Sequence, residues 1–345
     1  MDSVCFEVNN KCNLYCMHCF QNANNGLPNE LSLNKFRECI SYTMLQGNRE
    51  VSLSGGEVFL HSDWFEMVKS IQYYRQQAMI VTNGTLINND IIRALKKLDH
   101  SKLGLTISID GPNQKKNDYI RGFGSFAKTL EALDLLKSSS LNCITNIQIV
   151  LTKETVRLVE NFLSLANKYD PKSVYFLFPQ KWGRALKNWN KIGLSEKEIL
   201  DAVYQVKQIR DEKVYRFKIG SAYDSFFLSD EIQDISCCSF GEDLYIDSAG
   251  NAYGCDGCYN SSKLKLGNIN EKPLFRILSS KRFATLINTC KERKTILEMC
   301  CTCPLLKKCA GGCMANAYLS KGSLIENDEY CDIRLKLQPG VVCFK

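Results

Sequence analysis

The feature that most constrains the fold is a regular alternation of short apolar runs with amphipathic stretches, from residue 3 to about residue 180. Short runs rich in β-branched residues indicate buried strands, and apolar positions three and four apart in the stretches between them indicate helices. Repeated strand–helix units favour parallel strands joined by crossover helices. We therefore expect an α/β domain built on an open sheet or on a partial or full barrel. The expected strands span 4–8, 50–53, 79–82, 104–109, 147–152 and 173–178, and the expected helices span 33–45, 64–74, 89–98, 125–136 and 156–169.

Polar and glycine residues follow the first four expected strands, at the same end of each strand. The carboxyl ends of parallel strands meet on one side of a sheet or barrel, and sites in such folds are built from the loops that follow them. We therefore expect one site assembled from several loops. The segments are Asn9-Asn10-Lys11-Cys12, Ser54-Gly55-Gly56-Glu57, Asn83-Gly84-Thr85, and Ser108 with Asp110-Gly111.

The chain changes character twice after residue 180. Residues 181–235 contain one charged amphipathic helix, and from residue 236 onward cysteine, glycine and short strands such as 243–247 predominate. We expect domain boundaries at these two changes. The expected helix N-caps are Asn88 or Asn89 for the third helix, Thr155 for the fifth, and Ser195, with Glu198 completing a capping box, for the charged helix.

Composition excludes several classes of function. The formal charge is +7, but acidic and basic residues are interspersed, and no Lys/Arg run interleaved with aromatic residues indicates a nucleic-acid groove. The first ten residues lack the basic and apolar segments of a signal peptide, and no apolar stretch of about eighteen residues predicts a membrane span. We therefore expect a cytoplasmic protein without a nucleic-acid or membrane partner.

Cysteine is the most informative residue type. Twelve of the 18 cysteines lie at or after residue 237, and three lie within residues 12–19. In a reducing compartment this distribution indicates metal or cluster ligands rather than disulfides. Soft thiolates bind iron–sulfur cubes, and the loop Cys12-x3-Cys16-x2-Cys19 supplies three ligands for four corners. The alternative is a zinc site that His18 or a distant residue completes.

The spacing of Cys12, Cys16 and Cys19 resembles the cluster loop of radical S-adenosylmethionine (SAM) enzymes, and His18 before the third cysteine fits the aromatic-type position of that loop. The resemblance implies a [4Fe–4S] cluster whose fourth iron binds the amino and carboxylate groups of SAM. Reductive cleavage of SAM then releases a 5′-deoxyadenosyl radical, so that the cofactors carry the chemistry and the protein places them. An external electron donor such as flavodoxin or ferredoxin is implied as a partner.

Other strand-end loops resemble the SAM-binding segments of the same family. Gly55-Gly56-Glu57 resembles the motif in which exposed backbone and a carboxylate meet the SAM ammonium group, and glycine allows a close approach. Ser108, Asp110 and Arg121 resemble the segment that binds ribose and carboxylate, in which Arg121 is expected to pair with the SAM carboxylate. The alternatives are a plain turn, a strand end and a surface ion pair. Asn83 is expected either in the same site or as a turn residue.

The C-terminal cysteines follow a second pattern, with Cys300-x2-Cys303-x5-Cys309-x3-Cys313 as its densest part. The spacing is similar to the SPASM domain, an extension of one branch of radical SAM enzymes that carries two auxiliary [4Fe–4S] clusters; two zinc sites are the alternative. The resemblance implies that Cys238, Cys255 and Cys313 hold the first auxiliary cluster and that Cys300, Cys303, Cys309 and Cys331 hold the second.

Two assignments near Cys255 stay open. The fourth ligand of the first auxiliary cluster is Cys258, no protein residue at all, or Cys237. Asp256 follows Cys255 directly, and in sulfatase-maturating members of the branch an aspartate in that place deprotonates the substrate, whereas a structural hydrogen bond is the alternative. Six further cysteines are expected to be structural thiols, namely Cys5, Cys39, Cys143, Cys290, Cys301 and Cys343.

The two resemblances together imply three parts. Residues 1–180 are expected to form a partial (β/α)6 TIM-like barrel, residues 181–235 a connector with an amphipathic helix, and residues 236–345 a small cysteine-rich α+β SPASM-like domain. Phe178-Pro179 and Gly183-Arg184-Ala185 resemble the segment that joins barrel and tail in this branch.

The leading hypothesis is a radical SAM oxidoreductase that removes a hydrogen atom from a peptide or protein side chain and gives a crosslinked or oxidised product with the help of the auxiliary clusters. Alternatives are an anaerobic sulfatase-maturating enzyme that forms formylglycine from Cys or Ser, and a small-molecule or porphyrin-precursor enzyme of the same branch. A scaffold without activity is a further alternative, which the set of SAM-site motifs opposes. Because the chain begins directly on its first strand, a peptide-recognition module is expected, where needed, on a separate protein.

Overall fold

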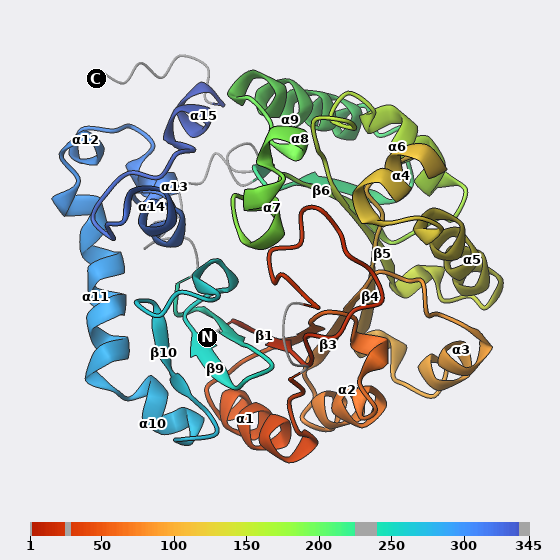
Figure 1. Ribbon diagram of the computed structural model, residues 1–345, viewed down its shortest axis with the longest axis horizontal. Coiled ribbons are helices and arrows are strands. Elements are labelled where there is room, and N and C mark those ends of the chain that lie inside the picture. The colour runs from red at the N-terminus through yellow and green to blue at the C-terminus, as the bar shows by residue number, and fades with distance from the viewer. Residues whose placement is uncertain (1, 25–28, 225–239, 338–345) are drawn as a thin grey trace.

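In the computed structural model, the described residues are 2–24, 29–224 and 240–337. One ten-stranded sheet runs through them in the order β10-β9-β8-β1-β2-β3-β4-β5-β6-β7. Each strand from β1 to β6 pairs in parallel with its successor, and helices surround the curved sheet on the outside (Figure 1). The strands are β1 Ser3–Glu7, β2 Glu50–Ser54, β3 Gln77–Thr82, β4 Leu103–Ser108, β5 Thr145–Val150, β6 Ser173–Leu177, β7 Lys218–Ser221, β8 Asp243–Ile246, β9 Asn251–Tyr253 and β10 Lys265–Asn268.

The α-helices connect these strands and form most of the C-terminal region. They are α1 Leu33–Leu45, α2 Trp64–Tyr73, α3 Asn89–Leu95, α4 Gln114–Arg121, α5 Ser125–Ser138, α6 Val159–Asn167, α7 Gly183–Lys187, α8 Trp189–Ile192, α9 Glu196–Asp211, α10 Leu274–Leu278, α11 Lys281–Ile296, α12 Glu298–Cys301, α13 Leu306–Cys309, α14 Met314–Lys321 and α15 Cys331–Lys336. The six expected strands and five expected helices are therefore all present, which confirms the expected α/β class and its partial barrel of parallel strands.

The core lies between the sheet and its surrounding helices. Strand β4 is buried from Leu103 to Ile107, as a central parallel strand covered on both faces should be. On β1, Phe6 packs edge-on against Phe36 of α1 with ring centroids 4.8 Å apart. Because β1 to β4 pair in parallel, the loops that follow them lie at one end of the sheet.

Two of the three predicted helix N-caps are observed in the structure, and the third is not. Asn88 caps α3 by accepting from two backbone amides, and Ser195 with Glu198 forms the expected capping box of α9. The prediction of Thr155 as an N-cap is wrong, because α6 begins at Val159. Instead, the Thr155 hydroxyl accepts from the backbone N–H of Thr152 at 3.0 Å, so this side chain stabilises a turn before the helix.

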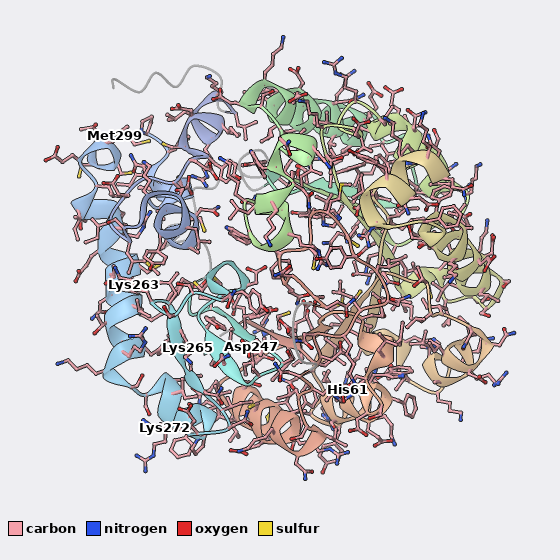
Figure 2. The ribbon with its side chains drawn as sticks, viewed as in Figure 1. His61, Asp247, Lys263, Lys265, Lys272 and Met299 are labelled. Atoms are coloured by element: carbon pink, nitrogen blue, oxygen red, sulfur yellow. The ribbon has the colours of Figure 1, made fainter. Side chains whose placement is uncertain are left out.

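The sheet continues across both predicted domain boundaries. Strand β7 adds to β6 from within residues 181–235, and β8 pairs in parallel with β1, with Ser3 opposite Asp243. Asp247, which is labelled in Figure 2, closes the turn after β8. Its carboxylate accepts from Ala249 N at 3.0 Å and from Asn251 N at 2.8 Å. The predicted division into three parts stays a prediction.

Candidate active site

The loop that carries the first three cysteines lies at the carboxyl ends of the strands. Cys12, Cys16 and Cys19 line one cavity of about 620 Å³, together with residues from the ends of β2, β3 and β4. Figure 1 shows this loop inside the ring of strands and helices, next to α7. The lining from the strand ends comprises Ser54, Gly55, Gly56, Thr82, Asn83 and Ser108. The structure thus brings these loops together around one cavity, and their role as one site stays a prediction.

The glycines after β2 hold the stem of the cysteine loop. Gly56 N donates to Asn9 O at 2.8 Å, and Glu57 N donates to Lys11 O at 2.7 Å. A Cβ at Gly56 would lie 2.0 Å from Lys11 O, and one at Gly55 would lie 2.5 Å from Asn9 O. Both glycines therefore allow the close approach of two backbone segments. The sequence suggested that these positions are glycine so that SAM can approach closely. The structure adds a second reason, which is the close packing of the two backbone segments.

The carboxylate of Glu57 is buried behind the two glycines. It accepts from the Thr82 hydroxyl at 2.6 Å and from Asn83 N at 2.9 Å, so it joins the loop after β2 to the end of β3. Burial raises the pKa of Glu57, and these hydrogen bonds and the charge of Arg121 oppose the rise. In this structure the backbone of the motif faces the cavity, and the carboxylate organises the strand ends.

Asn83 supports the first cysteine. Its amide nitrogen lies 3.8 Å from Cys12 Sγ and donates to Asn13 Oδ1 at 2.9 Å. Its side-chain oxygen Oδ1 accepts from Thr85 N and from the Thr85 hydroxyl, at 2.9 and 2.6 Å. Asn83 is thus a turn residue and a cavity residue at once, and the two interpretations of the sequence do not exclude each other.

His18, Asp110 and Arg121 form a buried triad beside the cluster loop. Asp110 Oδ2 lies 2.6 Å from His18 Nε2 and accepts from Arg121 Nε at 2.5 Å, while Oδ1 accepts from Val150 N at 2.8 Å. Burial by itself raises the pKa of Asp110, but Arg121 and His18 outweigh it and hold this pKa well below its usual range. The alternative of a surface ion pair is wrong, since the Arg121 side chain is only 7% exposed.

Arg184 on α7 is a residue that sequence reasoning missed as part of the site. Its Nε donates to Cys16 O at 3.0 Å, its Nη1 to Ala23 O at 2.5 Å, and its backbone N to Cys19 O at 3.0 Å. The guanidinium also stacks on Tyr15, 3.7 Å from the ring centroid. Arg184 therefore holds the later part of the cysteine loop, whereas the glycines hold its stem.

The tail contributes Asp256 to the same cavity. Its carboxylate is accessible from the cavity and accepts from Gly257 N at 2.8 Å. Burial by the surrounding protein raises the pKa of Asp256, and the nearby charge of Asp243 adds to the rise, while the Gly257 bond opposes it. The structure thus brings the predicted base into the cavity of the three cysteines.

The cysteines predicted to hold the first auxiliary cluster are only partly described. Cys255 and Cys258 are buried with their sulfur atoms 3.4 Å apart, and Cys313 lies close enough to interact electrostatically with Cys255. Cys237 and Cys238 lie outside the described residues. Cys258 is therefore placed beside Cys255 as a ligand would be, and its role stays a prediction.

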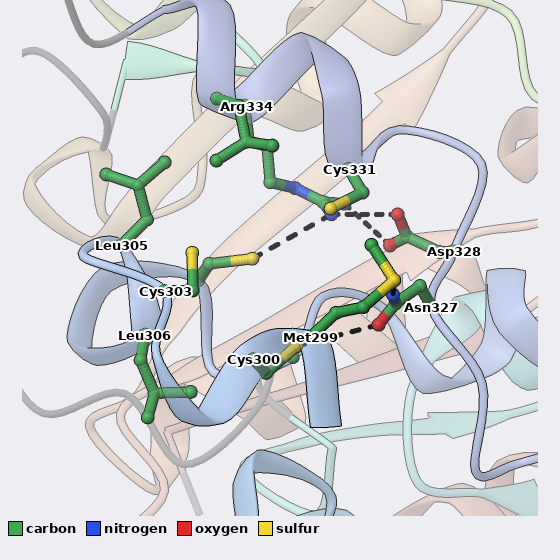
Figure 3. A pocket seen from close by; sticks show the side chains of 12 residues that line it. Met299, Cys300, Cys303, Leu305, Leu306, Asn327, Asp328, Cys331 and Arg334 are labelled. Atoms are coloured by element: carbon green, nitrogen blue, oxygen red, sulfur yellow. Dashed lines mark hydrogen bonds and ion pairs between the residues drawn. The ribbon is translucent and has the colours of Figure 1, made fainter. Parts of the chain in front are cut away.

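The four cysteines predicted for the second auxiliary cluster line a second cavity. Cys300, Cys303, Cys309 and Cys331 surround it with Asp328 and Arg334 (Figure 3). Within residues 2–24, 29–224 and 240–337, no three His, Cys, Asp or Glu side chains are grouped as ligands of a single metal ion. The fit of a cluster rests instead on the donor set, since each thiolate of a cube binds a different iron.

Burial around Cys16 raises the pKa of its thiol to about 12. The charge of Arg121 opposes this rise, and the neighbouring Asp110, Cys19 and Cys12 add to it. Bound iron deprotonates a coordinating thiol outright, so the surroundings of Cys16 suit a metal-bound thiolate better than a free one.

Comparison with known proteins agrees with this geometry. Residues 6–166 match the radical SAM superfamily, and residues 237–304 match SPASM, an iron–sulfur cluster-binding domain. The chain thus carries a radical SAM domain, which binds SAM and a [4Fe–4S] cluster, followed by a SPASM domain. The SPASM domain is of the kind that binds auxiliary iron–sulfur clusters. Cys309, Cys313 and Cys331 lie beyond the matched residues, and their assignment stays a prediction.

Three relatives illustrate the range of proteins to which the chain is similar. The chain is 26% identical over 94% of its length to the mycofactocin maturase MftC of Mycolicibacterium smegmatis, and it covers 81% of that protein. It is 25% identical to an AdoMet-dependent heme synthase of Methanosarcina barkeri, with 96% of both chains covered. It is 26% identical to the cysteine-type anaerobic sulfatase-maturating enzyme of Clostridium perfringens, over 93% of this chain and 90% of the other.

A solved structure confirms the fold. The native enzyme anSMEcpe with bound AdoMet superposes with a TM-score of 0.75 at 20% identity, over 98% of this chain and 96% of that one. Among the described residues, no helix is long and apolar enough to cross a membrane.

Proposed function

We propose that this enzyme abstracts a hydrogen atom from a side chain of a peptide or protein and yields a crosslinked or oxidised product. The observation that carries the proposal is the shared cavity of about 620 Å³, which the three cysteines of the N-terminal loop and Asp256 of the tail both line. A substrate in this cavity contacts the SAM side and the SPASM side at once. An external one-electron donor such as flavodoxin or ferredoxin belongs to the proposal.

On the SAM side, Cys12, Cys16 and Cys19 hold the cluster, and the strand-end residues form the cofactor cradle. Bound SAM supplies the radical that takes the hydrogen atom. The cradle consists of His18, Gly55, Gly56, Glu57, Asn83, Ser108, Asp110 and Arg121. Within it, Glu57 and Asp110 act through the residues they position, because their carboxylates are buried.

The substrate side of the cavity favours a peptide over a porphyrin precursor. It carries Phe178 and Trp182 as apolar surface and amide side chains such as Gln180 and Asn316, which lie 3.4 Å apart. Amides donate to and accept from peptide groups. A porphyrin precursor needs cations for its carboxylates, yet among the described lining residues the arginines are Arg121, paired with Asp110, and Arg184, engaged with backbone carbonyls.

Formation of formylglycine is the second candidate function. Asp256 supports it, because a carboxylate that reaches the cavity suits a base for a substrate thiol or hydroxyl. The sulfatase-maturating relative at 26% identity is consistent with it. In both candidates Asp256 is the proposed catalytic residue from the tail.

The test is anaerobic reconstitution with iron and sulfide, followed by addition of SAM and dithionite. The proposal predicts release of 5′-deoxyadenosine, and absence of this product in an iron-loaded protein would contradict it. Mass spectrometry then separates the candidates. A sulfatase-motif peptide with Cys or Ser that gains an aldehyde would establish the second function, whereas crosslinking or oxidation of a precursor peptide would establish the first. Conversion of a porphyrin precursor alone would contradict both.

A further inference from the structure

The second auxiliary cavity contains a cation aimed at one of its cysteines. Arg334, three residues after Cys331 on α15, places Nη1 3.9 Å from Cys309 Sγ. Its guanidinium makes a bidentate pair with Asp328, with Nη1–Oδ1 at 2.8 Å and Nη2–Oδ2 at 2.7 Å. The Arg334 side chain is 12% exposed and that of Asp328 is fully buried. The pair is therefore shielded from water and lies against a thiol.

The other end of this pair contacts the neighbouring auxiliary site. Asp328 Oδ2 accepts from the backbone N–H of Cys313 at 2.6 Å, and Oδ1 accepts from Tyr330 N at 3.0 Å. A Cβ at Gly312 would lie 2.7 Å from both Asp328 Oδ2 and Arg334 Nη1, and the backbone there has φ of +75°. A glycine is thus required for the chain to pass directly over the ion pair.

We propose that the Asp328–Arg334 pair connects the two auxiliary sites: Arg334 raises the reduction potential of the cluster at Cys300, Cys303, Cys309 and Cys331, and Asp328 holds Arg334 and the backbone of Cys313 in place. The inference rests on the cluster ligands assigned by the proposed function. The four thiols around one cavity provide the soft donor set that a cube requires.

The physical reason is the direction of the pair's dipole. Reduction adds one negative charge to a cluster, and a guanidinium or N–H donor at a ligand sulfur stabilises that charge. The positive end of the pair faces Cys309, and the negative end faces the Cys313 amide. Replacing Arg334 leaves the buried, negative Asp328 carboxylate without its partner near the second auxiliary cluster. Neutralising Asp328 instead leaves the positive Arg334 guanidinium there without a compensating charge. The two changes must therefore shift the potential in opposite directions.

The test uses the full chain with Cys12, Cys16 and Cys19 replaced by Ala, reconstituted anaerobically so that about eight iron atoms of the two auxiliary cubes remain. Redox titration followed by electron paramagnetic resonance gives the potential of each cluster. The variants are Arg334→Gln and Asp328→Asn. The control is Lys321→Gln, which removes the same charge from an exposed side chain of the same region.

Arg334→Gln is expected to lower the equilibrium constant for reduction of one cluster at least tenfold. For a one-electron couple this is a fall of the reduction potential by at least 59 mV. Asp328→Asn is expected to raise the potential of the same cluster, and the control is expected to change neither. Unchanged potentials at full iron content, or shifts of the same sign in both variants, would overturn the inference.

If Arg334→Gln loses iron from one cluster, the Asp328→Asn variant decides, because it retains the guanidinium of Arg334. A higher reduction potential of the second auxiliary cluster in Asp328→Asn supports the inference, and an unchanged or lower potential overturns it. If the protein with only Cys12, Cys16 and Cys19 replaced binds about four iron atoms instead of eight, the assignment of the auxiliary cluster ligands is wrong, and the inference fails with it.

Discussion

Replacing Arg184 by Gln tests whether the cluster loop is held from the α7 side. The change removes two charged donors, Nε to Cys16 O at 3.0 Å and Nη1 to Ala23 O at 2.5 Å, and it removes the guanidinium that stacks on Tyr15. Both carbonyls belong to the segment that carries the cluster ligands. We therefore expect the substitution to act on the loop and on SAM binding before it affects the rest of the fold.

The magnitude follows from these contacts. A hydrogen bond from a charged donor contributes about 1.5–3 kcal/mol, so two of them contribute about 3–6 kcal/mol. Desolvating the guanidinium costs part of this, which leaves an estimate of about 3 kcal/mol for the closed arrangement of the loop. By the relation between free energy and equilibrium constant, this is roughly a hundredfold change.

The assay is SAM affinity of the anaerobically reconstituted enzyme, measured by calorimetry, together with iron content. Arg184→Gln should weaken SAM binding roughly a hundredfold while the iron of the tail is retained. The matched control is Arg282→Gln, since Arg282 also donates to backbone carbonyls, at Lys265, Ser262 and Lys263, but lies away from the loop. Equal effects of the two substitutions, or no effect of the first, would refute the reasoning.

Three further predictions concern other parts of the structure. Burial raises the pKa of Glu7 from 4.5 to about 7, against the hydrogen bonds from Ser248 and Tyr245. Protonated Glu7 therefore stabilises the fold fully below pH 4.5, and this contribution of about 3 kcal/mol is lost as pH rises through 7. Glu7→Gln should flatten the fall of the melting temperature between pH 5.5 and 8.5. Parallel curves of melting temperature against pH for the two proteins would contradict this. Gly56→Ala should abolish SAM cleavage, because the new Cβ meets Lys11 O at 2.0 Å, whereas Gly47→Ala, which meets nothing within 4 Å and adds only the backbone strain of a φ of +81°, should retain it. Asp256→Asn should keep reductive cleavage of SAM but slow product formation by about 10²–10⁴, as measured by mass spectrometry; equal loss of both would assign Asp256 a structural role.

Much of the fold could be predicted because apolar periodicity is a local signal. The bounds of α1 agree with the sequence, and the expected strands differ from the observed ones by a few residues. Strand β7 was missed, because its four residues Lys-Ile-Gly-Ser carry too short a pattern to distinguish from a turn. The pairing of β8 with β1 was missed as well, since it depends on the whole sheet and leaves no local trace.

In the candidate site, too, the features with a local sequence pattern could be predicted, and those that depend on contacts between distant segments could not. Cysteine spacing identified the cluster loop, because three thiolates in eight residues have few other uses. The contacts of Arg184 with Cys16 and Cys19, and of Arg334 with Cys309, join distant segments. The motif Gly183-Arg184-Ala185 predicted only a joining segment, and no motif predicted the contact of Arg334. The burial of Glu57 was equally invisible, because only the folded structure brings Thr82 and Asn83 to its carboxylate.

The central claim is that Cys12, Cys16 and Cys19 hold a cluster that serves SAM and is separate from the iron of the tail. The most direct measurement is iron content and 5′-deoxyadenosine release of Cys16→Ala after anaerobic reconstitution. We expect this variant to retain about eight of about twelve iron atoms and to cleave no SAM. SAM cleavage that persists in this variant, or loss of all its iron, would show that Cys16 does not hold a separate SAM-binding cluster.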